Sequence, residues 1–115
     1  MTETSRSRIA RSIPSVLRRV VRAGTLQADI EGSSVEIVGA EQGLEASIII
    51  HDADAVARRV LRTGGVGLAE AYIDGQWDSP DLAGLLEFAA DNHDRRRHTA
   101  MWETAMRTSR TAWDR

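Results

Sequence analysis

Turn-forming glycines divide the middle of this chain into short segments. Because glycine readily adopts the backbone conformations that end helices and strands, their spacing limits residues 24–75 to short elements. The apolar patterns between the glycines then decide which segments are strands and which are helices. The glycines that mark the divisions are Gly24, Gly32, Gly39, Gly64, Gly65 and Gly75.

Strand patterns follow Gly24. Leu26, Ala28 and Ile30 alternate with polar residues, residues 35–38 continue the alternation, and residues 44–50 end in three isoleucines. Alternating side chains and β-branched residues are typical of strands with one buried face. The sequence predicts two or three antiparallel strands joined by turns rich in Gly and Ser.

Helical patterns lie on both sides of these strands. Before them, apolar residues from Ile9 to Val21 follow one helical face, with Ser12 as a candidate cap and Pro14 in the first turn. After them we expect a helix over 53–63 capped by Asp52, a second helix over 68–73, a brief strand at 76–78, and a helix that begins at Ser79. The polar run at 92–98 is expected to interrupt that helix. A last helical stripe contains Trp102, Met106, Ser109 and Trp113.

The order of helix, strands and helices predicts an α+β fold, with a small antiparallel sheet and flanking helices. A chain of 115 residues suits one domain of ordinary size. We expect a basic amphipathic helix over residues 1–24, an α+β body over 25–92, and a C-terminal helix or linker over 93–115.

Charge is distributed unevenly along the chain. Residues 1–24 carry six Arg and one Glu, whereas the remainder carries nine Arg and sixteen acids, for a net charge of −2. The basic helix either lies on anionic lipid or docks on the sheet with its arginines in water, and docking of the aliphatic face is the favoured interpretation. Nucleic acid is not expected as a partner, because the body is acidic. The candidate membrane-surface residues are Arg11, Arg18, Arg19 and Arg22.

Several classes of chemistry have no support in the sequence. The chain has no Cys, which excludes disulfides, thiol nucleophiles and Cys-type zinc sites. The three histidines lack a flanking nucleophile, and the aspartates at 74, 78 and 81 suit turns and helix caps. The glycines at 64, 65 and 67 follow a helix rather than a strand, which argues against a nucleotide cradle. We assign no catalytic, cofactor-binding or metal-ligating residue, and no run of residues is apolar enough for a membrane span.

Tyr72 and Trp77 allow two interpretations. Both are core aromatics of a small domain, or both line an apolar groove, since each has an apolar body and a polar tip. On the second interpretation they form, with Leu68, a lipid-facing set.

The run GGVGLAEAYIDGQWDSPDLAGLLEFAADN, residues 64–92, is the most specific feature of the chain. It resembles the N-terminal region of cyclopropane-fatty-acyl-phospholipid synthases and their fatty-acid-methylating relatives. The elements that carry the resemblance are a glycine-leucine turn ending at Leu68, Glu70, Tyr72 with Ile73, the Asp74-Gly75 pair, Trp77-Asp78 and a leucine-rich helix. The preceding strand and helix are similar too, so the resemblance covers roughly residues 25–92.

The resemblance implies a lipid-binding module of the sterol-carrier type. In this family a separate domain transfers a one-carbon unit from S-adenosylmethionine to an unsaturated acyl chain of a phospholipid. This chain lacks that domain, so we expect a fragment or truncated product that holds no cofactor itself. Its expected partners are phospholipid acyl chains, an anionic membrane surface, the missing methyltransferase domain and a second copy in a homodimer. Its expected location is the cytoplasm, at the inner face of the membrane.

Two alternatives of other classes stay open. The first is a free-standing lipid carrier with an enclosed apolar cavity, which a co-purifying lipid would reveal. The second is a protein-interaction module that docks through the Trp102 and Trp113 stripe, which dimerisation lost in Trp113→Ala would reveal.

The absence of a cofactor domain predicts that this chain alone transfers no methyl group. Incubation with radiolabelled S-adenosylmethionine and unsaturated phospholipid vesicles should leave the extracted lipid unlabelled. Label in the lipid above the protein-free control would contradict the assignment of the chemistry to other residues.

Overall fold

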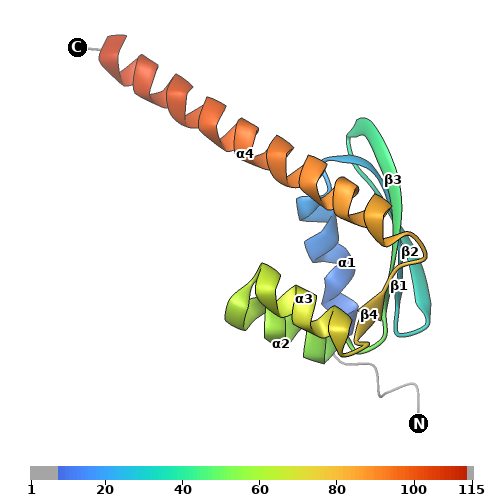
Figure 1. Cartoon of the computed structure of the whole chain (residues 1–115). Helices are drawn as coiled ribbons and strands as arrows, with labels where there is room; N and C mark the ends of the chain where they lie inside the picture. The colour runs from blue at the N-terminus through green and yellow to red at the C-terminus, as the bar shows by residue number, and fades with distance from the viewer. Residues whose placement is uncertain (1–7, 114–115) are drawn as a thin grey trace.

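Four strands form one mixed sheet, and the helices gather on one side of it (Figure 1). The computed structural model describes residues 8–113, without the side chains of residues 98–103 and 108–113. The spatial order of the strands is β2-β1-β3-β4. This arrangement confirms the predicted α+β class, whereas the likeness to sterol carriers stays a prediction. The strands are β1 (Ala23–Ile30), β2 (Ser33–Val38), β3 (Glu41–Ile50) and β4 (Trp77–Asp78), and the helices are α1 (Arg8–Val20), α2 (Ala53–Thr63), α3 (Gly65–Ile73) and α4 (Leu82–Trp113).

The sheet is not antiparallel throughout, and this part of the prediction was wrong. β1 pairs with β2 antiparallel, but β1 and β3 run parallel, and β3 pairs with β4 antiparallel. The hairpin formed by β1 and β2 returns the chain to the end of the sheet where β1 begins. A strand that starts there on the other side of β1 has to run in the same direction as β1.

The crossing from β2 to β3 takes two residues and passes over the start of β1. The Gly39 N–H donates to the Gly24 carbonyl at 2.9 Å, and the Glu41 N–H donates to the Arg22 carbonyl at 3.1 Å. A Cβ at position 39 would lie 2.6 Å from backbone atoms of Arg22 and Ala23. Only glycine fits so close an approach of two backbones, so Gly39 permits the parallel pairing.

The turn between β1 and β2 also holds the start of α2. Glu31 and Gly32 both have positive φ, 52° and 90°, as a two-residue type I′ hairpin requires. A Glu31 carboxylate oxygen accepts a hydrogen bond from the N–H of Ala53 at 2.9 Å, and Asp52 accepts from Ala55 at 3.1 Å. Two carboxylates therefore satisfy the first turn of α2, which confirms Asp52 as its cap.

The glycines at the junction of α2 and α3 let the two helices meet closely. Gly64, with φ 60°, ends α2, and its N–H donates to the Val60 carbonyl at 2.8 Å. A Cβ at Gly67 would lie 2.0 Å from the Arg59 carbonyl oxygen. The predicted place of these glycines, at the junction of two helices, is confirmed.

α1 docks on the protein body by its aliphatic face. Ala10 is buried, and Ile9, Ile13, Leu17 and Val20 pack against the core. The helix begins at Arg8, so Pro14 lies inside it rather than in its first turn, contrary to the prediction. Packing of the flanking apolar residues offsets the cost of an internal proline.

α4 is continuous, and the predicted interruption at 92–98 is absent. Asp81 caps its start, because its carboxylate accepts from the Gly84 N–H at 3.0 Å. Leu85 and Phe88 bury their side chains in the core. Beyond the body the helix projects outward, and the molecule measures 63 × 25 × 25 Å (Figure 1). A polar run does not end a helix when its residues retain helical propensity and contain no Gly or Pro.

Asn92 is the buried polar residue where α4 passes the start of β1. Its Oδ1 accepts from the N–H groups of Arg22 at 2.6 Å and Ala23 at 2.9 Å. Its Nδ2 donates to the carbonyls of Ala23 at 3.1 Å and Phe88 at 3.2 Å. The amide thus uses both donors and both acceptor positions in a site that leaves it 5 % exposed.

Among the described residues, no helix combines the length and the apolar character needed to cross a bilayer.

The close approach at Gly67 predicts a sharp difference between two neighbouring glycines. Gly67→Ala should lower the free energy of unfolding by about 2 kcal/mol, because its Cβ overlaps the Arg59 carbonyl. Gly65→Ala is the control, since a Cβ there meets nothing within 4 Å, and it should be neutral or stabilising by up to about 1 kcal/mol. Urea unfolding followed by circular dichroism measures both. Equal effects of the two substitutions would contradict this account of the helix junction.

Candidate functional site: two separate surfaces

The arginines of α1 form one exposed face. At about 3.6 residues per turn, Arg8, Arg11, Arg18 and Arg19 fall within an arc of about 100°. All four are exposed, whereas the opposite side of the helix contacts the core. Arg18 and Arg19 occupy the last turn, where cations interact favourably with the helix dipole. We call these four residues the α1 arginine face.

No salt bridge within the described part of the chain involves this face. The ion pairs there join Arg59 to Asp74, and Arg95 to both Glu41 and Asp91. The fourth predicted membrane-surface residue, Arg22, is exposed but follows the helix, and Asn92 holds its backbone N–H. The α1 arginine face therefore presents its positive charge to solvent.

The predicted lipid-facing residues form a second cluster, at α3 and β4. The Trp77 Nε1–H donates to the Leu68 carbonyl at 2.8 Å. The rings of Tyr72 and Trp77 lie 4.9 Å apart between centroids, tilted by 53°. The structure therefore brings Leu68, Tyr72 and Trp77 together, as one cluster rather than three separate positions.

Exposure differs strongly within this cluster. Trp77 is 4 % exposed and Leu68 37 %, while Tyr72 is half-buried. The polar tip of Trp77 is occupied by the Leu68 carbonyl and faces the protein. Contact with an external ligand is thus restricted to Leu68 and part of Tyr72.

Three further apolar residues, on α2 and α3, are strongly exposed and were not predicted from the sequence as part of a site. Leu61 is 84 % exposed, Ile73 78 % and Val66 63 %. Val66 and Ile73 are seven residues apart on α3, which places them on one helical face. The excess of apolar residues on every side of α3 was the available sign, because a surface helix normally carries a polar face.

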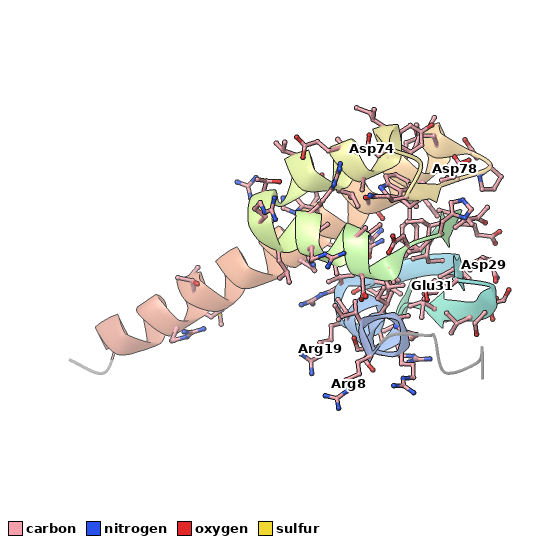
Figure 2. All side chains as sticks on the ribbon, turned by 90° about the horizontal axis from the view of Figure 1, so that it is seen from below. Arg8, Arg19, Asp29, Glu31, Asp74 and Asp78 are labelled. Atoms are coloured by element: carbon pink, nitrogen blue, oxygen red, sulfur yellow. The ribbon has the colours of Figure 1, made fainter. Side chains whose placement is uncertain are left out.

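The arginines of α1 and the two aspartates Asp74 and Asp78 lie on opposite sides of the molecule (Figure 2). Figure 2 shows Arg8 and Arg19 pointing away from the body on one side, and Asp74 and Asp78 on the other. Asp74 ends α3 and Asp78 follows Trp77 in β4. A flat lipid surface in contact with the α1 arginine face therefore lies on the side opposite Asp74 and Asp78.

Two hollows on the surface carry several polar groups in their lining, whereas a third, of about 180 Å³, is lined mainly by apolar groups that include Ile48, Ile49 and Pro80. One of about 270 Å³ lies between Arg59, Glu70, Ile73 and Asp74. Another, of about 250 Å³, lies on the sheet beside Pro80, and its lining includes Gln27, Glu45 and Ser47. An acyl chain is bound by predominantly apolar walls, which these two hollows lack.

The glycine run does not fit a cofactor. In the structure it joins α2 to α3, and the Arg59 carbonyl fills the space beside Gly67. A phosphate or nucleoside cradle needs open backbone N–H groups between a strand and a helix. Within the residues that the structure describes, no three acidic or histidine side chains gather as metal ligands. No reaction step is therefore assigned to these residues.

Arg95 connects α4 to the start of β3. Its guanidinium donates to Asp91 at 2.9 Å and to Glu41 at 2.7 Å. The hydrogen bond to Asp91 raises the pKa of Arg95, and Glu41 adds to this effect. Both ion pairs of Arg95 are partly exposed to solvent, so their contribution to stability is small.

Comparison with known proteins gives one relative. The chain is 30% identical over 96 residues to the tuberculostearic acid methyltransferase UfaA1 of Mycobacterium tuberculosis. The alignment covers 82% of this chain and 22% of that protein, so the chain spans about a fifth of the length of the curated relative it matches. No family model and no solved structure matches the chain. The similarity supports a relationship to the fatty-acid methyltransferases, which is the coarser part of the predicted resemblance.

The buried tip of Trp77 predicts a structural effect of its replacement. Trp77→Phe should lower the free energy of unfolding by about 2 kcal/mol, because it removes the hydrogen bond to Leu68 and leaves a gap. Tyr72→Phe, which removes only a hydroxyl from a half-buried ring, should change it by less than about 0.5 kcal/mol. Urea unfolding measures both, and an unchanged midpoint for Trp77→Phe would contradict the role of this contact.

Proposed function

We propose that this chain is the lipid-recognition part of a methyltransferase of the cyclopropane-fatty-acyl-phospholipid synthase type. It contacts anionic phospholipid at the inner face of the cytoplasmic membrane, and residues outside it transfer the methyl group from S-adenosylmethionine. The similarity to a tuberculostearic acid methyltransferase supports the family. The specific role is argued from the α1 arginine face.

That face is the single observation that carries the proposal. Arg8, Arg11, Arg18 and Arg19 are exposed together, while the aliphatic side of α1 is used inside the protein. The helix therefore binds a lipid surface by charge rather than by insertion of its apolar side. Each arginine held near an anionic bilayer contributes about 1 kcal/mol, and four on one face suffice for reversible binding.

The cluster of Leu68, Tyr72 and Trp77 has a different role in the proposed function. Trp77 is buried and Tyr72 is half-buried, and the indole N–H of Trp77 is bound to the Leu68 carbonyl inside the protein. We assign to Trp77 the support of the α3–β4 junction, and we restrict direct lipid contact to α1. Leu68, Tyr72 and Trp77, which the sequence suggested as lipid-facing residues, are therefore assigned no direct lipid contact.

Charge-driven binding predicts a salt-sensitive association with vesicles. The chain should co-sediment with vesicles containing phosphatidylserine at 0.1 M salt and dissociate at 1 M salt, because the Debye length falls from about 10 Å to about 3 Å. It should not sediment with vesicles of phosphatidylcholine alone. Failure to bind anionic vesicles at low salt would overturn the proposed function.

A matched pair of double substitutions locates the contact. Arg18→Gln with Arg19→Gln should weaken vesicle binding about tenfold or more, since two charges leave the α1 arginine face. Arg58→Gln with Arg62→Gln removes the same charge from exposed positions of α2 and should weaken it by less than about threefold. Equal losses would mean that net charge, rather than this face, drives binding. A lipid co-purifying with the chain and resistant to salt would instead favour a carrier.

A further inference from the structure

α4 leaves the body in a direction that its last buried contacts determine. Leu85, Phe88 and Asn92 lie on one face of the helix and are buried, whereas the next residue that contacts another element, Arg95, forms an exposed ion pair. Asn92 is therefore the last buried contact of α4 with the body among the described side chains. The part of α4 beyond it is about 32 Å long, at a rise of about 1.5 Å per residue.

Asn92 binds the junction that follows α1. Its Oδ1 accepts from the N–H groups of Arg22 and Ala23, the residues that lead from α1 into β1. Its Nδ2 donates back to Ala23 and to Phe88 on α4 itself. One side chain thus joins the junction between α1 and β1 to α4.

The direction of α4 at Asn92 determines where the far end of this helix lies. A change of 20° at Asn92 would displace the far end of the helix by about 11 Å. Figure 2 shows α4 running sideways, across the direction in which Arg8 and Arg19 point, whereas Asp74 and Asp78 lie on the opposite side. A lipid surface in contact with the α1 arginine face would therefore have α4 running along it.

We propose that Asn92 is the positioning residue that holds α4 along the lipid surface contacted by α1. This inference rests on the proposed function, because it needs α1 on the lipid. It adds a fixed geometry to that function: binding through α1 determines where α4 lies, and the hydrogen bonds of Asn92 transmit that geometry from one helix to the other.

The first measurement tests the geometry without lipid. The chain has no cysteine, so cysteines introduced at the exposed positions Ser15 and Met106 carry the only two spin labels. The native chain should give a single narrow distance distribution. Asn92→Leu, which removes all four hydrogen bonds, should broaden it at least twofold. Asn92→Asp retains the acceptor for Arg22 and Ala23, so its distance distribution should be much narrower than that of Asn92→Leu and close to that of the native chain.

Arg95→Ala is the matched control, one turn along the same helix. It removes the exposed contact between α4 and β3 and should leave the distribution as narrow as that of the native chain. A distribution for Asn92→Leu as narrow as the native one would overturn the role of Asn92. If Asn92→Leu fails to fold, the comparison of Asn92→Asp with Arg95→Ala decides, because the proposal requires the first to be the broader.

The second measurement tests the placement on lipid. A donor fluorophore attached to the variant Met106→Cys or to the variant Asp78→Cys is combined with acceptor-labelled headgroups in phosphatidylserine vesicles. Energy transfer to the headgroups should be stronger from position 106 than from position 78. Asn92→Leu should reduce the energy transfer from position 106, while the lipid concentration at half-maximal vesicle binding changes less than twofold. Equal or weaker transfer from 106 would overturn the placement. Absence of vesicle binding in every variant would overturn the proposed function and the placement with it, whereas the spin-label distances would still decide whether Asn92 fixes α4.

Discussion

A buried amide side chain joins the first strand of this fold to its last helix. Asn92 satisfies two N–H groups and two carbonyls around Arg22, Ala23 and Phe88, in a place from which water is excluded. Backbone groups buried without partners cost free energy, so the crowded start of β1 depends on this residue. The crossing chain at Gly39 and the end of α1 both lie at this point, and Asn92 lets α4 pass it closely.

The glycine crossing has a consequence for the surface of the protein. Because Gly39 lets the chain pass over β1 in two residues, β3 pairs parallel to β1 without a long connection. The helices then cover one face of the sheet, and the other face carries exposed polar side chains such as Gln27 and Glu36. α1 takes its place among the packed helices, so its aliphatic side is buried and its arginines are left to solvent.

The α1 arginine face and the aromatic cluster of α3 and β4 differ in their exposure to solvent. The α1 arginine face offers unpaired positive charge, as far as the described residues extend, and the aromatic cluster of α3 and β4 is turned inward through the Trp77 indole. The similarity to a fatty-acid methyltransferase agrees with the lipid contact that we propose for the α1 arginine face. Asn92 connects the residues that follow α1 to the projecting helix α4, 70 positions further along the chain.

Local patterns in the sequence determined the α+β class, the Asp52 cap, the glycine junction before α3 and the amphipathic character of α1, because each depends on neighbouring residues. The direction of β3, the continuity of α4 and the burial of Asn92 were decided by tertiary structure, since each depends on residues up to 70 positions away. The polar run at 92–98 looked like an interruption because its first residue, Asn92, finds its partners only in the folded protein. The same reason applies to the predicted lipid-contacting residues: local patterns identified Leu68, Tyr72, Trp77 and the arginines, and only packing buried Trp77 and left the arginines of α1 exposed.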